Sequence, residues 1–165
     1  MTERLLEMLQ GLPPDLLVAV LSAAPVSELR GGIPVGLLVL HLPLWRVWLV
    51  AVVANILVVS PIVWGFEWLT DALEQRPVLG GIFRWAVHHA RSKRAMVEKH
   101  GMWALTLWCA LPVPGAGAWT GALIGPLVGM PFWRTMTCVA LGTAIASGLV
   151  TALTLGGVLA FHAAH

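Results

Sequence analysis

The sequence contains very little charge. Only 11% of its 165 residues are Asp, Glu, Lys or Arg, whereas 58% are hydrophobic and the mean hydropathy is +0.84. A soluble domain has roughly a quarter charged residues. From Gly101 to the C-terminus, Arg134 is the single residue of these four types. This composition excludes an ordinary soluble domain and predicts an integral membrane protein.

The sequence also lacks the residue clusters that most enzymes and metal sites need. Its two cysteines, Cys109 and Cys138, lie in separate apolar segments and form no CxxC pair. We therefore expect them to be small buried residues. The six histidines have no zinc-like spacing, and no nucleophile and base fall close together. The sequence predicts no enzymatic activity, no metal site and no cofactor.

Four apolar runs begin near Leu16, Leu44, Met102 and Phe132, and each approaches the ~20 residues that a spanning helix needs. None of them alternates as a strand would. Because lipid requires every backbone amide to be paired, we expect an all-α integral membrane protein. The whole chain, residues 1–165, is expected to form a single membrane domain.

A basic segment separates the apolar runs into two halves. Between Arg76 and His100 there are six Lys or Arg residues against one acidic residue, Glu98. The positive-inside rule places such a segment in the cytoplasm, which predicts a multi-pass protein of the cell inner membrane. We expect an amphipathic connecting helix after Pro77 that contacts anionic lipid headgroups, and no nucleic-acid partner.

The two halves resemble each other. Pro25-Val26 aligns with Pro112-Val113 at an offset of 87, and Pro43-Leu44-Trp45-Arg46 aligns with Pro131-Phe132-Trp133-Arg134 at an offset of 88. Each half has an apolar arm, a Pro/Gly-rich break, a second apolar arm, a P-x-W-R corner and a long span. The sequence predicts two repeats, 15–68 and 101–158, joined by the basic connection 69–100.

The arms are too short to cross a bilayer separately. The first runs for about ten residues from Asp15 and the second from Ile33 to Leu42, each near half of the hydrocarbon thickness. They form either one discontinuous span or a re-entrant hairpin, and we favour the hairpin. Since the segment from Trp45 to Trp68 predicts one full span, the two hairpins would enter from opposite faces. Many secondary transporters use this inverted-repeat plan.

The first break carries two charges, in the stretch SELRGGIP from Ser27 to Pro34. Poor solvation disfavours the charged form of a carboxylate, so Glu28 is a candidate proton or cation site. Arg30 offers planar donors for a phosphate or carboxylate. Two residues apart, these side chains are expected on different sides of a helix, without neutralising each other. The alternative is an ordinary loop whose two charges lie among lipid headgroups.

The second break, LPVPGAGAWTG, offers exposed backbone instead of charge. For Gly121, Gly125 and Gly129, spaced by four, we expect close helix packing. Three further residues are secondary candidates. Asn55 is expected to form an interhelical hydrogen bond. Arg46 and Arg134 are expected to snorkel to the interface or to bind lipid phosphate.

The motifs ELRGGIP and PVPGAGAWTGAL, in this order, resemble the small multi-drug export proteins of bacteria and archaea, which are related to the DedA and VTT membrane proteins. The resemblance covers about Asp15 to Gly157. It implies re-entrant hairpins in an inverted repeat, and either proton-coupled transport or lipid translocation. The implied site residues are Glu28, Arg30, Gly31, Gly32, Pro34, Pro112, Pro114, Gly115, Gly117, Trp119 and Thr120. DedA relatives carry further acidic and arginine residues in the second half, where this chain has only Arg134.

These observations favour a secondary transporter or exporter of a small amphipathic or anionic substrate, coupled to protons or cations through Glu28. One alternative is a flippase or scramblase of polyprenyl-phosphate-like lipids, and another is a non-transporting membrane scaffold. Membrane lipids and a second copy of the chain are the expected partners, because a homodimer would bury more of so small a bundle.

Overall fold

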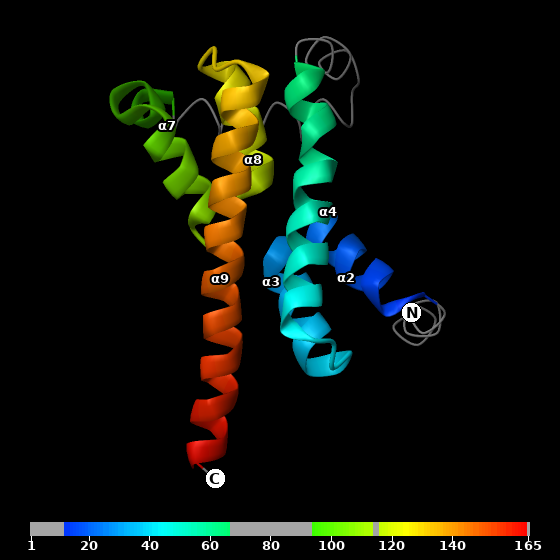
Figure 1. Cartoon of the computed structure of the whole chain (residues 1–165). Coiled ribbons are helices and arrows are strands. Elements are labelled where there is room, and N and C mark those ends of the chain that lie inside the picture. Colours follow the sequence, from blue (N-terminus) through cyan, green and yellow to red (C-terminus); the bar gives the residue numbers. More distant parts are fainter. Residues whose placement is uncertain (1–11, 67–93, 114–115, 165) are drawn as a thin grey trace, which may run out of the picture. The chain divides into compact units, whose positions relative to one another are not determined.

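The computed structural model describes residues 12–66, 94–113 and 116–164, and every element within these ranges is a helix (Figure 1). The all-α prediction is therefore confirmed for this part of the chain. The predicted helix after Pro77 lies outside the described residues. The elements are α2 (Pro14–Ala23), α3 (Glu28–Pro34), the π-helix η1 (Val35–Val39), α4 (Leu44–Trp64), α7 (Arg94–Ala110), α8 (Ala118–Leu127) and α9 (Phe132–Ala164).

Two of the described helices, α4 with 21 residues and α9 with 33, are long and apolar enough to cross a membrane. At ~1.5 Å per residue α4 is about 31 Å long, which matches the hydrocarbon thickness. Its residues Trp45, Leu49, Val53 and Leu57, spaced by four, form one exposed apolar face. Helix α4 ends at Trp64, and Trp68, the predicted end of this span, lies outside the described residues.

The chain divides into two compact units that each contain one pair of short helices. Unit 1 comprises residues 1–55 and 147–165, and unit 2 comprises residues 56–146. Both long helices are divided near their middle. Unit 1 holds the first half of α4 and the later half of α9, whereas unit 2 holds the later part of α4 and the first half of α9.

In unit 1, α2 packs against α3 and η1. Helices α2 and α3 lie beside the first half of α4 (Figure 1). The proline at the start of α2, Pro14, suits a first helical turn because that turn needs no backbone N–H there. The chain leaves η1 and turns at Pro43 into α4. We call α2, α3 and η1 together hairpin 1.

In unit 2, the apolar part of α7 packs against α8. Gly101, with φ 63° and ψ −147°, kinks α7, so that an apolar arm begins at Met102. We call this arm and α8 hairpin 2. Its core also contains Val59 and Val63 from α4 and Met136 and Val139 from α9. Cys109 and Cys138 are buried in this core as thiols, which confirms the expectation for both cysteines.

Candidate functional site

The two ends of hairpin 1 lie on the same side of unit 1. Asp15, in the first turn of α2, forms an ion pair with Arg46 in the first turn of α4. At the other end of α2, the Asn55 side-chain amide donates to the Ser22 carbonyl at 2.9 Å. Arg46 and Asn55 are nine residues apart on α4, or about 13 Å along its axis. The tip of hairpin 1 therefore lies level with the middle of α4.

The Asn55 bond joins α4 to α2, so the predicted interhelical hydrogen bond is confirmed. Arg46 is exposed and its guanidinium is paired with Asp15, a partner that the sequence did not predict. Arg134, the corresponding arginine of the second half, is an exposed residue of α9. The two corner arginines differ in whether an acidic residue is present to pair with them. Position 15 is an aspartate, whereas its counterpart 87 residues later is Met102.

The break in hairpin 1 comes earlier than predicted. Helix α2 ends at Ala23, the chain turns through residues 24–27, and the motif ELRGGIP is itself the helix α3. The sequence-based expectation of non-helical backbone at Gly31 and Gly32 is therefore wrong. A Cβ at Gly32 would overlap the Ser22 hydroxyl and lie 3.1 Å from the Val18 carbonyl oxygen. This glycine permits close packing of α3 on α2.

The proline of the motif shapes the rest of the second arm. Pro34 lies inside the helix, where it has no N–H to donate to Arg30, and the helix continues as the π-helix η1. In η1, Gly36 faces Val47 of α4 and Val18 of α2, and a Cβ there would lie 2.8 Å from a Val47 methyl carbon. The second arm thus runs from Glu28 to Val39, instead of from Ile33 to Leu42.

Glu28 is a buried acidic residue, with 7% of its surface exposed. It is the first residue of α3 and has φ 45°, in the left-handed region that glycine favours. Its carboxylate Oε2 lies 3.4 Å from Arg30 Nη2, and the Arg30 side chain is 25% exposed. The expectation that Glu28 and Arg30 diverge is wrong, because the left-handed φ at Glu28 takes it out of regular helical geometry.

Two buried oxygens near the tip of hairpin 1 are unsatisfied. Ser22 Oγ and Asn55 Oδ1 have no hydrogen-bond partner among the described residues, and both residues are at most 1% exposed. A buried polar atom without a partner costs free energy, typically about 1–3 kcal/mol. Sequence reasoning missed Ser22, since a lone serine in an apolar run carries no recognisable signal.

Helix α7 ends at Ala110 and α8 begins at Ala118, and Pro114 and Gly115 between them lie outside the described residues. Gly117, expected at the tip, precedes α8 and has φ 133°. Thr120 Oγ1 accepts a bond from the Trp108 indole at 3.1 Å and itself contacts the Gly117 carbonyl at 3.2 Å. Trp119 is partly buried against the core. These contacts join the two arms, and Pro112 begins the turn between them.

The predicted glycine face of α8 is correct at two of three positions. A Cβ at Gly121 would overlap Cys109 Sγ, and a Cβ at Gly125 would overlap the Thr135 side chain. Gly129 behaves differently, because it lies beyond the end of α8 with φ 76° and open space around it. Its packing role was predicted wrongly: it is needed for a left-handed turn before Pro131.

Two close glycine contacts in each hairpin occur at corresponding positions. Gly32 faces Ser22 in unit 1, and Gly121 faces Cys109 in unit 2. Gly36 faces Val47, and Gly125 faces Thr135. Ser22 and Cys109 differ by 87, Val47 and Thr135 by 88, and each glycine pair by 89. With offsets of 87 to 89 residues, the register of the repeat therefore extends approximately to the contacts between arms.

The same register relates the polar centres of the long helices. Asn55 of α4 corresponds to Thr143 of α9, and each is 1% exposed with a side-chain oxygen that has no partner among the described residues. Glu28 corresponds to Gly117 at the offset of 89, and both have positive φ. Their conformations differ, because Gly117 has φ 133° and ψ −167° whereas Glu28 has φ 45°.

No curated protein and no solved structure matches the chain. A family model does match residues 28–149 of the chain, a range that includes Glu28, the second break, α4 and the first half of α9. The chain is a membrane protein and belongs to the family described as "Putative small multi-drug export protein".

Proposed function

We propose that this protein is a secondary transporter that exports small amphipathic molecules across the cell inner membrane, coupled to a proton or cation through Glu28. The observation that carries the proposal is the burial of Glu28 at the start of α3, in a left-handed conformation, beside Arg30. A left-handed conformation costs a non-glycine residue roughly 1–2 kcal/mol. Such strain at a buried charge is typical of functional sites.

The depth of Glu28 supports a transport role. If α4 spans the bilayer, Asn55 lies near the midplane, and Ser22 and Gly32 of hairpin 1 lie at the same level. Glu28 precedes Gly32 by four residues, about 6 Å of helix. A charged pair at this depth is costly in lipid, so it is retained where it lines a path for ions or substrate.

The composition of the two units supports an inverted repeat of re-entrant hairpins. Hairpin 1 packs on residues 46–55 of α4, whereas the core of hairpin 2 contains Val59 and Val63 of the same helix. In a spanning α4, these halves belong to opposite leaflets. Each hairpin would then enter from its own face, with the connection after α4 in the cytoplasm.

The Glu28–Arg30 pair suggests how coupling works. Arg30 favours the charged carboxylate, whereas burial favours the protonated one, and the two effects oppose each other. Protonation of Glu28 would weaken its ion pair with Arg30, so that the guanidinium could interact more strongly with a polar or anionic group of the substrate. Substrate binding and proton binding at this site would therefore depend on each other.

Flux measurements in proteoliposomes test the proposal. An amphipathic fluorescent substrate should move when a pH gradient is imposed, and Glu28→Gln should abolish the dependence on the gradient. Asp15→Asn is the matched control, because it removes a carboxylate from the same hairpin at an exposed ion pair. Its flux should stay near that of the wild type.

Two results would contradict proton-coupled export. Gradient-independent movement of labelled phospholipid, unchanged in Glu28→Gln, would indicate a lipid scramblase. Absence of both fluxes, with the protein folded by tryptophan fluorescence, would indicate a scaffold.

A further inference from the structure

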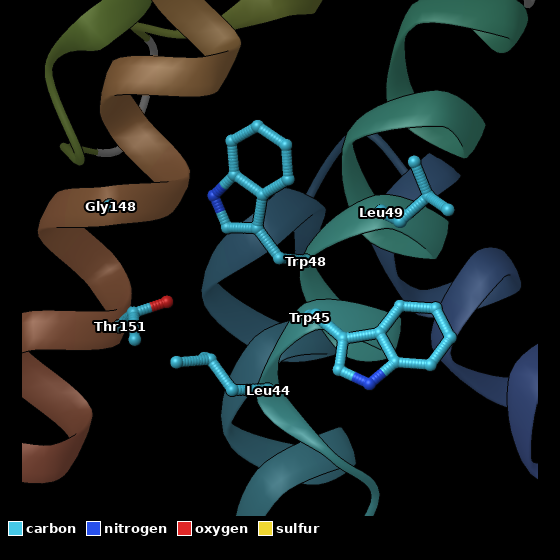
Figure 2. A pocket seen from close by; sticks show the side chains of 6 residues that line it. All are labelled: Leu44, Trp45, Trp48, Leu49, Gly148 and Thr151. Carbon is cyan, nitrogen blue, oxygen red and sulfur yellow. The ribbon is translucent and has the colours of Figure 1, made fainter.

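Unit 1 contains a pocket outside the hairpin. It has a volume of about 570 Å³ and lies between the first two turns of α4 and the later half of α9 (Figure 2). It is lined by Leu44, Trp45, Trp48, Leu49, Gly148 and Thr151. Ligand pockets for drug-sized molecules have volumes of about 300–1,000 Å³, so this space fits a small molecule.

The lining sets the chemistry of the occupant. No Asp, Glu, Lys or Arg is among the six residues, so the pocket offers nothing to neutralise a full charge. Two indole rings offer flat faces and edges for stacking on another aromatic ring. The lining therefore suits a neutral aromatic group better than a charged one.

One polar atom is available to orient such a group. Thr151 Oγ1 is buried and has no hydrogen-bond partner among the described residues. Figure 2 shows its hydroxyl directed from α9 toward the side of α4 that carries Trp48. Pockets that bind small molecules commonly combine apolar walls with a few polar groups of this kind. A ligand hydroxyl or carbonyl would satisfy this oxygen.

The corresponding position in unit 2 is closed. At the offset of 88, Trp48 corresponds to Met136 and Thr151 to Val63. Met136 and Val63 are 8% and 6% exposed and belong to one buried cluster, against which Phe132 also packs. The same place in the fold is thus filled by side chains in unit 2 and left open in unit 1.

We propose that this pocket binds the neutral aromatic portion of the amphipathic molecules that the protein exports. The identification of the occupant as a transported substrate rests on the proposed function, whereas binding in the pocket is a separate property. Trp45 and Trp48 stack on the aromatic ring, and Thr151 bonds the polar atom next to it. Gly148 provides the space opposite the indoles.

Photolabelling of the full-length protein in phospholipid nanodiscs tests this assignment. The probe is 4-(hydroxymethyl)benzophenone, a neutral molecule with two aromatic rings and one hydroxyl. Under illumination it should label mainly the peptides containing residues 44–49 and 148–151, identified by mass spectrometry.

Two substitutions on α9 provide a matched pair. A Cβ at Gly148 and a Cβ at Gly156 both meet open space, so either glycine accepts a larger side chain without a backbone clash. Gly148→Leu should fill the pocket and remove the label from these peptides, and Gly156→Leu should leave it unchanged. Thr151→Val keeps the shape and removes the hydroxyl, and should weaken probe binding by about fivefold, the value of one neutral hydrogen bond.

Two outcomes would overturn the assignment. One is labelling spread over the exposed apolar faces and unchanged in Gly148→Leu. The other is labelling of the pocket in detergent that disappears in nanodiscs while a phospholipid with a photoactivatable acyl chain labels the same peptides, which would identify a lipid site. The same experiments distinguish failure of the proposed function from failure of the pocket assignment. Pocket labelling without any Glu28-dependent flux would contradict the proposed export but not binding in the pocket. Glu28-dependent flux without pocket labelling would contradict binding in the pocket but not the proposed export.

Discussion

Replacement of Gly32 by alanine should separate the two arms of hairpin 1. The added Cβ would overlap the Ser22 hydroxyl and lie 3.1 Å from both Ser22 Cβ and the Val18 carbonyl oxygen. Overpacking of this kind typically costs about 1–3 kcal/mol. The higher helix propensity of alanine than of glycine offsets up to about 1 kcal/mol of this cost. We therefore expect a net destabilisation of about 1–2 kcal/mol.

A double-mutant cycle tests whether the clash with Ser22 causes the destabilisation in Gly32→Ala. Ser22→Ala removes the oxygen that the new Cβ meets, and this oxygen has no partner among the described residues, so the single change should cost little. In the double variant, Ser22→Ala should recover most of the stability lost in Gly32→Ala. The recovery should exceed the ~0.5 kcal/mol by which independent sites deviate from additivity.

Thermal unfolding in detergent, followed by tryptophan fluorescence, measures these effects. Each kcal/mol should shift the Tm by about 2–4 °C for a chain of this size. Gly121→Ala with Cys109→Ala forms the corresponding cycle in unit 2 and should behave alike. Gly148→Ala is the control without a clash and should not lower the Tm. A wild-type Tm for Gly32→Ala, or no recovery with Ser22→Ala, would refute the close packing of the arms.

Two further predictions concern Glu28 and the topology. Glu28→Gly should raise the Tm, because glycine accepts φ 45° without strain, yet it should lose gradient-dependent flux; a lower Tm would show that the Arg30 ion pair outweighs the strain. The topology can be mapped with single cysteines at Thr2, Arg91 and His165 in a variant without Cys109 and Cys138. An impermeant maleimide added outside should label the Arg91 position in inverted vesicles and the two terminal positions in right-side-out vesicles. Both termini should share one face and Arg91 the other, whereas all three on one face would indicate four complete crossings.

Much of the architecture follows from local features of the sequence. Scarce charge and long apolar runs predict membrane helices, and α4 and α9 are found where these runs lie. The repeated Pro-Val breaks and P-x-W-R corners predict where the arms end, and Pro43 and Pro131 do precede the two long helices. Each of these signals acts within a few residues, so no knowledge of neighbouring helices is needed to read it.

The candidate site depended on contacts between segments far apart in the chain. A glycine that frees the backbone and a glycine that admits a neighbour look identical in a sequence. Gly32 lies inside a helix, and it must be glycine because Ser22 occupies the space that a side chain would need. Gly129, on the same predicted face as Gly121, instead forms a turn. Only the tertiary structure decides between these roles, because the role is set by which surface lies opposite the missing Cβ.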